Sequence, residues 1–396
     1  MKKKVVSLLA AMALAVTALA GCGSNNAATT GTDAATVAAT TEAAGTTEAA
    51  GTTEAATDSE AVTGVKAGFI FLHDENSTYD LNFLNGAKAA CEKLGIEYMT
   101  KTNIPEGQEA YEAACELADA GCNFIFADSF GHEDYIIEAA KEYPDVQFSH
   151  ATGTKAHTEG LDNFHNAFAS IYDGRYLAGI VAGMKTEKNY IGYVAAKGIP
   201  EVIRGINAFT LGVQSVNPDA KVEVVFTDTW YDPSVEKQAA LELLNKGVDV
   251  IAQHQDTTAP QVAAQEKGAY CIGYNFPTAD AAPDAYLTAA CFNWATFYTD
   301  DCQRALDGTW TSRAYWEGLA ANMTYLDDLT ALCAEGTQEK VDAARDSIID
   351  GSFDPFTGPL YDQNGELKVE EGVKMTDDEI WNMNWFVQGV VGSIPA

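Results

Sequence analysis

The stretch that decides the fold is Val65-Lys66-Ala67-Gly68-Phe69-Ile70-Phe71-Leu72. It is a largely apolar run of strand length, and the polar run His73-Asp74-Glu75-Asn76-Ser77-Thr78 follows directly. Such a run is typical of a strand that is buried on both faces. Residues 79–94 then have helical spacing and end at Gly95, and residues 96–100 form a second strand pattern. The order strand, helix, strand predicts a parallel sheet with helices on its faces.

The same alternation continues along the chain and then starts again. Before residue 150 we expect strands at 123–127 and 146–150 and helices at 106–120 and 133–142. The second round has the following expected elements: helices at 172–184, 200–216, 233–245 and 259–267, and strands at 190–194, 222–226, 248–252 and 270–273. After about residue 285 the pattern loosens, with a returning strand at 285–292 and a helix at 300–306. Two rounds of this kind predict two lobes.

The fold class that follows is α/β, with two doubly wound parallel-sheet lobes joined by a hinge. We expect residues 64–170 plus about 286–320 in the N-terminal lobe, and residues 171–285 plus about 321–396 in the C-terminal lobe. In doubly wound folds, ligands bind outside the carboxyl ends of the strands. Two facing lobes place those ends around a shared cleft, which closes by a hinge motion.

The N-terminus has the pattern of an export signal. Lys2, Lys3 and Lys4 precede an uncharged apolar run over residues 5–20, which is too short to span a bilayer. The following Leu19-Ala20-Gly21-Cys22 resembles the lipobox of bacterial lipoproteins, which implies cleavage after residue 21 and a lipid on Cys22. The alternative is an ordinary signal peptide that ends near a cysteine. Residues 22–63 are rich in Ala, Thr and Gly and are predicted to be a disordered linker. This predicts a protein held by lipid on the extracytoplasmic face of the cell membrane.

Charge and composition exclude several classes of function. The chain has 24 basic and 57 acidic residues, a net charge of −33, and loss of the three N-terminal lysines would leave −36. Such a charge repels nucleic acids, so we expect no nucleic-acid partner. Hydrophobic residues make up 47% of the chain, which excludes global disorder. The eight cysteines contain no CxxC pair, and the sequence leaves their pairing open.

Motifs that carry catalysis or hold cofactors are missing from the sequence. It contains no Walker loop, no Gly-x-Ser-x-Gly and no His-Glu-x-x-His. Its six histidines are scattered without the spacing of metal ligands. We therefore expect no enzyme activity, no metal and no cofactor.

Aromatic and amide side chains instead follow the predicted strand ends. They occur in five segments: 73–80, 128–131 with Phe130, 228–233 with Trp230, 253–256 with His254 and Asp256, and 274–275 with Asn275. Flat side chains on both sides of a cleft suit a flat aromatic ligand, and Asp, Asn and Gln supply donors and acceptors for its edge. Core packing is the alternative for each aromatic taken alone.

Four segments together resemble the basic membrane protein (BMP) family, the substrate-binding lipoproteins of ABC importers with a type I periplasmic-binding fold. These segments are Tyr172-Asp173-Gly174-Arg175-Tyr176-Leu177-Ala178-Gly179-Ile180-Val181-Ala182-Gly183, Ile199-Pro200-Glu201-Val202-Ile203-Arg204-Gly205-Ile206-Asn207-Ala208-Phe209, Trp230-Tyr231-Asp232-Pro233 and Phe353-Asp354-Pro355-Phe356-Thr357-Gly358-Pro359. The resemblance covers residues 65–392. It implies uptake of purine nucleosides or of related purine and flavin compounds.

The resemblance also implies roles for particular residues. Nucleoside binders of the family stack a Phe on the base, and Thr78-Tyr79-Asp80 occupies that place here. Trp230 fits the slot of the second stacking aromatic. The family's ribose-binding Asp and Lys are matched by Asn275 and Phe292, which carry no charge. These departures favour a free, adenine-like nucleobase over a nucleoside.

The ligand site predicted from the sequence has nine members: Thr78, Tyr79, Asp80, Phe130, Trp230, His254, Asp256, Asn275 and Trp294. We expect a monomer that captures a purine and delivers it to the permease and ATPase subunits of an ABC importer. A nucleoside or flavin binder of the same transport class stays open as an alternative. So do a surface enzyme that acts on purines and a sensory or adhesion lipoprotein.

Overall fold

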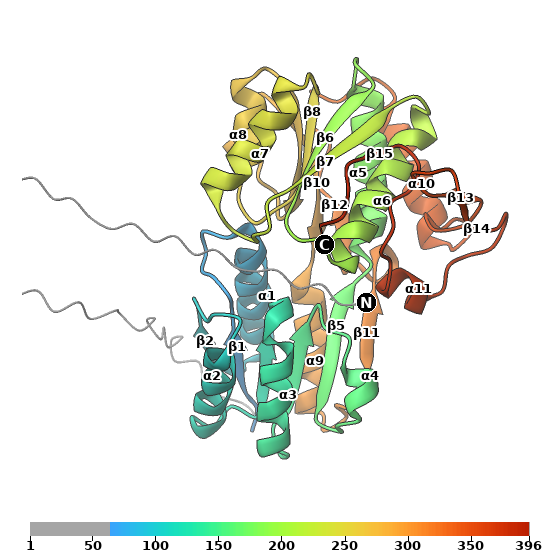
Figure 1. Ribbon diagram of the computed structural model, residues 1–396. Coiled ribbons are helices and arrows are strands. Elements are labelled where there is room, and N and C mark those ends of the chain that lie inside the picture. The colour runs from blue at the N-terminus through green and yellow to red at the C-terminus, as the bar shows by residue number, and fades with distance from the viewer. Residues whose placement is uncertain (1–63, 396) are drawn as a thin grey trace, which may run out of the picture. The chain divides into compact units, whose positions relative to one another are not determined.

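The structure is a computed structural model that describes residues 64–395. The predicted signal peptide, Cys22 and the linker lie outside the described residues. Figure 1 shows two β-sheets, each flanked by helices. The α/β class with two parallel-sheet lobes, predicted from the alternation, is confirmed. Among the described residues, no helix is both long and apolar enough to cross a membrane.

The first sheet has six strands in the order β11-β5-β4-β3-β1-β2, and all neighbouring pairs are parallel. Its strands are β1 (Lys66–Ile70), β2 (Glu97–Lys101), β3 (Phe124–Ala127), β4 (Gln147–Ala151), β5 (Phe164–Ala169) and β11 (Ala314–Glu317). Its helices are α1 (Thr78–Leu94), α2 (Gln108–Asp119), α3 (Glu133–Glu142), α4 (Ala156–Glu159) and α9 (Trp294–Leu306), with the short η1 (Phe130–His132). Phe69 packs into the core on one face of β1, and Ile70 packs into the core on the other. The first strand is therefore buried on both faces, which explains its unbroken apolar run.

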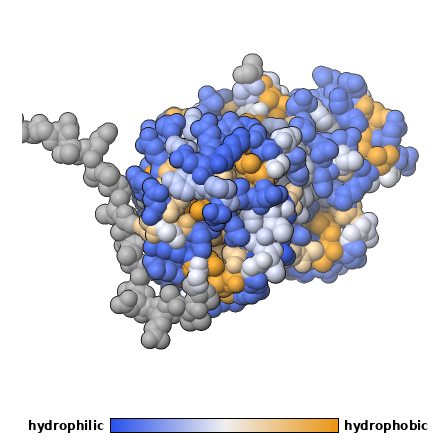
Figure 2. Space-filling view, turned by 90° about the horizontal axis from the view of Figure 1, so that it is seen from below, coloured by the Kyte–Doolittle hydropathy of each residue, from blue (hydrophilic) through white to orange (hydrophobic). Residues whose placement is uncertain are grey.

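The molecule has a largely hydrophilic surface on the face seen from below (Figure 2). Figure 2 shows one face, on which hydrophilic residues surround separate hydrophobic patches. The seven cysteines among residues 64–395 are free thiols, and five of them are buried. A buried cysteine packs as a small hydrophobic residue.

The second sheet has seven strands in the order β12-β10-β9-β8-β6-β7-β15, and only its edge strand β12 is antiparallel. Its strands are β6 (Tyr190–Ala195), β7 (Lys221–Phe226), β8 (Val250–His254), β9 (Tyr270–Asn275), β10 (Tyr286–Phe292), β12 (Thr324–Leu326) and β15 (Val390–Val391). Around it lie α5 (Ile171–Lys185), α6 (Pro200–Val216), α7 (Pro233–Asn245), α8 (Ala259–Glu266), α10 (Thr337–Ile349) and α11 (Asp377–Trp381), with η2 (Ala279–Ala281) and η3 (Leu319–Ala321). The C-terminal segment adds the small sheet β13 (Leu360–Tyr361) and β14 (Leu367–Val369).

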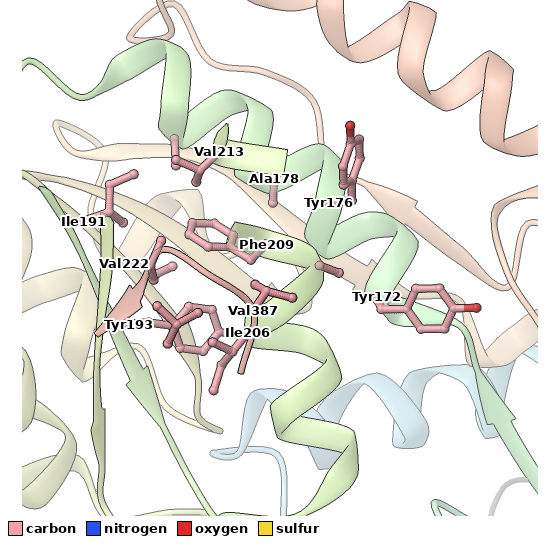
Figure 3. Packing of buried hydrophobic residues seen from close by; sticks show 14 of the residues in the cluster. Tyr172, Tyr176, Ala178, Ile191, Tyr193, Ile206, Phe209, Val213, Val222 and Val387 are labelled. Atoms are coloured by element: carbon pink, nitrogen blue, oxygen red, sulfur yellow. The ribbon is translucent and has the colours of Figure 1, made fainter. Parts of the chain in front are cut away.

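Helices α5 and α6 pack closely against each other. A Cβ at Gly179 would lie 2.1 Å from the Phe209 carbonyl oxygen, and a Cβ at Gly212 would lie 2.0 Å from that of Tyr176. Figure 3 shows Phe209 packed beside Tyr193, and both side chains are fully buried. This packing holds α6 (Pro200–Val216) directly against α5.

The chain crosses between the two sheets three times, after β5, after β10 and after β11. The predicted return to the first lobe at about residue 286 is wrong, because β10 pairs with β9 and extends the second sheet. The return follows Phe292, and α9 begins at Trp294, earlier than the expected helix at 300–306. Strand β5 was not predicted, although all six of its residues are buried. Its segment, Phe164-His165-Asn166-Ala167, mixes polar and apolar residues and so lacks the apolar signal of the other strands.

Candidate ligand-binding site

A cavity with about 340 Å³ of empty space lies where the carboxyl ends of the two sets of strands face each other. Leu72, Tyr79, Ser129, Phe130 and Thr152 line it from the first half, and Glu201, Trp230, His254, Asp256 and Tyr274 line it from the second. We call it the aromatic cavity.

The Tyr79 wall is fixed by the cap of helix α1. Ser77 is the N-cap and accepts a hydrogen bond from the Asp80 amide, 3.2 Å away. Asp80 in turn accepts hydrogen bonds from the His73 amide (2.7 Å) and the Ser77 hydroxyl (2.5 Å). Burial raises the pKa of Asp80, but His73 and Ser77 outweigh this and lower it. Asp80 therefore organises the loop before α1 and does not line the cavity.

The Tyr79 hydroxyl donates to the Asp128 carbonyl oxygen at 2.9 Å, which ties it to the end of β3. The Asp128 carboxylate accepts from the Leu72 amide at 3.1 Å and is fully buried. Burial, with the charge of Asp80 second, raises the pKa of Asp128 well above its usual range. The Tyr79 ring also packs edge-on against Phe83 of α1, with 4.7 Å between centroids. Both ends of this side chain are thus held.

Trp230 lies in the loop between β7 and α7. Asp232 caps α7 by accepting from the Ser234 and Val235 amides, and Pro233 occupies the first turn. The Trp230 carbonyl oxygen accepts from the Asp256 amide at 3.2 Å. The backbone of this loop is anchored, whereas the indole Nε1 has no hydrogen-bond partner among the described residues.

His254 and Tyr274 form the inner end of the cavity. The His254 Nε2 lies 3.4 Å from the Glu201 carboxylate, and its ring lies 4.5 Å from that of Tyr274. Burial lowers the pKa of His254 to about 4, so the imidazole is neutral at pH 7. Below Tyr274, the Arg175 guanidinium lies 3.5 Å from the ring centroid and donates to the Gln253 carbonyl oxygen at 2.6 Å.

Asp256 joins the two halves of the site. Its carbonyl oxygen accepts from the Thr78 amide at 2.9 Å and from the Thr78 hydroxyl at 3.3 Å. Its carboxylate accepts from the Asn275 side-chain amide at 3.1 Å. Burial, and then the charges of Asp80 and Glu236, raise the pKa of Asp256 well above its usual range. A carboxyl group in this setting is ready to share a proton or accept a hydrogen bond from a ligand.

The structure places the nine predicted site residues in three groups. Five line the cavity: Tyr79, Phe130, Trp230, His254 and Asp256. Three lie behind its walls: Thr78, Asp80 and Asn275 are buried and take part in the hydrogen bonds described above.

Trp294 lies elsewhere, and its placement in the ligand site is corrected. It is fully buried in the core of the first half, stacked on Phe83 with 4.1 Å between centroids. It follows β10 by two residues, but as the first residue of α9 it turns into the core of the first sheet.

Sequence reasoning missed several lining residues, above all Glu201 and Tyr274. Tyr274 directly precedes Asn275 at a predicted strand end, so the same signal indicated it. Glu201 lies beside Pro200 in the first turn of α6, a position that sequence alone assigns to helix capping. Among the described residues, no group of three or more His, Cys, Asp or Glu side chains could hold a metal ion.

Two mainly parallel sheets, three crossings between them and a cleft at the facing strand ends are the features of the type I periplasmic-binding-protein fold. Solved structures share this fold. An ABC transporter solute-binding protein from Conexibacter woesei aligns with a TM-score of 0.62 at 22% identity, covering 73% of this chain and 98% of its own. One from Aeropyrum pernix K1 aligns with a TM-score of 0.64 at 18% identity, covering 73% and 92%.

The family of ABC transporter substrate-binding proteins described as PnrA-like (Bmp) matches residues 71–353, and the chain belongs to it. A Brucella abortus protein named as a purine-binding protein is 36% identical over 336 residues, which is 84% of this chain and 94% of the relative. A Haloferax volcanii protein, provisionally named an ABC transporter glucose-binding protein, is 34% identical over 304 residues, 76% and 73% of the two chains. Proteins of this family are extracytoplasmic solute-binding proteins that work with permease and ATPase subunits, and are not enzymes.

Proposed function

We propose that this protein captures an adenine-like purine nucleobase between its two halves and delivers it to an ABC permease. The observation that carries the proposal is the lining of the aromatic cavity. Tyr79, Phe130, Trp230 and Tyr274 supply flat surfaces, and His254 and Asp256 supply polar groups. Stacking contributes about 1 kcal/mol per ring beyond burial, and each edge hydrogen bond adds about 1 kcal/mol net.

The Brucella relative supports a purine, because its name states purine binding and the two chains align over most of their length. The Haloferax relative makes a sugar the second candidate. A sugar ring carries a hydroxyl on most carbons, and each buried hydroxyl needs a partner. The aromatic cavity offers more ring surface than polar groups, so a flat base satisfies it better.

Two buried side chains favour a base over a nucleoside. The amide nitrogen of Asn275 is already directed at Asp256 and Thr78, and Asn275 is fully buried. Phe292 packs between Tyr274 and Trp294, with 6.0 and 5.7 Å between ring centroids. Neither side chain offers a charge to ribose hydroxyls.

Capture would end in a closed state held by contacts between the halves. Thr78 of α1 bonds to Asp256, which follows β8, and the Asn82 side chain donates to the carbonyl oxygens of Asn275 (2.6 Å) and Phe292 (2.9 Å). These bonds lie beside the aromatic cavity and form only when the two halves meet. A ligand that touches both walls stabilises the closed state by its differential affinity for it.

A thermal-shift and calorimetry series on residues 64–396 tests the ligand. Adenine is expected to raise the melting temperature more than adenosine, riboflavin or glucose at equal concentration, because its flat ring fills the cavity without unpaired hydroxyls. Chromatography of the incubated mixtures checks for turnover of adenine or adenosine, and none is expected. A larger shift with adenosine would contradict the preference for a free nucleobase over a nucleoside. A shift with glucose alone would contradict a purine ligand.

We further propose that a lipid on Cys22 holds the protein at the membrane. In a host that processes lipoproteins, the full chain is expected in the membrane fraction, and Cys22→Ser in the released fraction. Cys333→Ser, which changes a half-buried thiol of the folded body, serves as the control and is expected to stay with the membrane. Equal membrane association of the full chain and Cys22→Ser would contradict the anchor.

A further inference from the structure

A second cavity adjoins the aromatic cavity and is larger. It encloses about 770 Å³ of empty space, counted to its open mouth, and shares Phe130, Thr152 and Glu201 with the aromatic cavity. Its other walls include Arg204 and Trp316. A molecule in the aromatic cavity therefore has a neighbouring space of different chemistry.

Arg204 is the unusual feature of the second cavity. It lies on α6, is only 6% exposed, and has no hydrogen-bond or ion-pair partner within residues 64–395. Its guanidinium carbon lies 5.2 Å from the ring centroid of Trp316. A guanidinium only donates, and a buried charge without a partner is costly. The side chain is thus prepared for an acceptor that enters the second cavity.

The charges around Arg204 do not cancel. Glu201 is the carboxylate that interacts electrostatically with Arg204. Burial raises the pKa of Glu201, but His254, Arg204 and Arg175 outweigh this, so the pKa lies below its usual value. His254 is neutral at pH 7, because burial lowers its pKa to about 4. Two buried guanidinium groups, Arg175 and Arg204, therefore face one carboxylate in a chain whose net charge is −33. One negative charge is needed to balance this cluster.

The other walls of the second cavity come from both halves and are aromatic. Trp316 of β11 meets Trp381 of α11 edge to face, with 5.5 Å between centroids. His157 of α4 stacks on Trp381 at 5.4 Å. Because α4 and β11 belong to the first half and α6 and α11 to the second, closure of the two halves assembles this space around Arg204.

We propose that the second cavity binds the carboxylate of a small organic acid, which pairs with Arg204 beside Trp316 and Trp381. A carboxylate is planar and singly charged, and its two oxygens match the fork of a guanidinium. A phosphate dianion would bring one negative charge more than Arg175, Arg204 and Glu201 need for balance. The acid is either a substituent on the captured ring or a separate molecule. The inference goes beyond the purine and needs only the second cavity.

Calorimetry with benzoate and its neutral isostere benzamide tests the charge directly on the unmodified protein. Benzoate is expected to bind at least about tenfold more tightly than benzamide, because only benzoate pairs with Arg204. In Arg204→Gln, benzoate affinity is expected to fall at least about tenfold, and Arg204→Lys should retain part of it. The matched control Arg345→Gln changes a partly exposed arginine on α10, outside both cavities, and is expected to bind benzoate normally.

The source of the acid is resolved by adding adenine. Benzoate that still binds at saturating adenine identifies a separate acid; competition, with purine-6-carboxylate binding more tightly than adenine, identifies a substituent on the ring. Equal affinity for benzoate and benzamide, no binding of either, or equal benzoate affinity in Arg204→Gln and Arg345→Gln would each overturn the inference. Adenine affinity is measured in parallel. A protein that binds benzoate but not adenine would contradict only the proposed purine ligand and leave the carboxylate site standing.

Discussion

The two walls of the cleft differ in how their polar groups are used. In the first half, the Tyr79 hydroxyl and the Asp80 carboxylate bond to neighbouring groups of the same half. In the second half, five polar atoms at or next to the cavities are left without partners among the described residues: Trp230 Nε1, His254 Nδ1, Tyr274 Oη, Asn275 Oδ1 and Arg204 Nε. Behind Tyr79 in the first wall, Asp128 Oδ2 is left without one. The first wall is fixed before a ligand arrives, whereas the second has hydrogen-bonding capacity to spare.

This difference suggests that the two walls have different roles in ligand binding. A preorganised wall loses little conformational freedom on binding, and so strengthens binding without discriminating between ligands. Unpartnered polar atoms discriminate, because a ligand that fails to satisfy them leaves them buried and unpaired. We therefore expect substitutions in the second wall to change affinity and selectivity, and substitutions in the first wall to change stability.

The largest effect is expected for Trp230→Ala. Removal of a large aromatic wall from a binding site usually costs 2 kcal/mol or more, which is about 30-fold in affinity. Adenine affinity measured by calorimetry should fall by at least that factor, with little change in melting temperature, since Trp230 is only partly buried. Tyr361→Ala, at an exposed aromatic outside the cleft, is the control. Unchanged affinity in Trp230→Ala would mean that the ligand lies elsewhere.

A matched pair of carboxylates compares the two walls directly. Asp256→Ala should weaken adenine binding by about tenfold. It should lower the unfolding free energy by less than Asp80→Ala does, because Asp256 accepts one side-chain hydrogen bond, from Asn275, and burial already disfavours its charged form. Asp80→Ala should lower the unfolding free energy by about 1–3 kcal/mol, since it removes the acceptor of the His73 and Ser77 hydrogen bonds. Calorimetry and urea unfolding separate the two effects. A larger loss of stability in Asp256→Ala, with a larger loss of adenine affinity in Asp80→Ala, would contradict the different roles proposed for the two walls.

The smallest effect concerns the crossing between the halves at the start of α5. Burial raises the pKa of Asp173 to about 7, although the Ser170 hydroxyl donates to it at 2.8 Å. The folded state thus favours the protonated acid, and stability present below pH 4 is lost as the pH rises towards 7. Asp173→Asn should therefore gain stability relative to the parent between pH 5 and pH 8, by roughly 1–2 kcal/mol.

Urea unfolding of both proteins at the two pH values measures this change. Adenine affinity should differ little between them, because Asp173 does not line the aromatic cavity. A constant difference in stability between pH 5 and pH 8 would show that Asp173 does not titrate in this range.

The fold could be predicted where one period dominates the sequence. Short apolar runs such as residues 65–72 and 248–252 are typical of strands that are buried in a sheet. Several of the predicted helices end at a glycine, which marks their boundaries. The side of the cleft to which β10 belongs could not be predicted, because its apolar sequence suits either sheet. Its pairing with β9 places β10 in the second sheet, and this pairing depends on tertiary contacts that the local sequence pattern does not encode.

The residues of the candidate site were likewise predictable only where a local pattern indicated them. Strand ends identified Tyr79, Trp230, His254 and Asp256, since the carboxyl ends of parallel strands meet at one edge. Trp294 satisfied the same rule and lies in the core, because the first turn of α9 directs it towards Phe83. Arg204 and Arg175 lie within apolar helices, where the sequence gives no sign that a cavity or a ring faces them.

The sequence by itself determined the alternation of strands and helices, the acidic character and the set of side chains at the strand ends, because periodicity and local turn chemistry are written in neighbouring residues. The tertiary structure alone decided which of those side chains face the cleft, which are held by partners and which keep free polar atoms. The physical reason is that burial and hydrogen-bond satisfaction depend on residues far apart in the chain, as the bond between Thr78 and Asp256 illustrates.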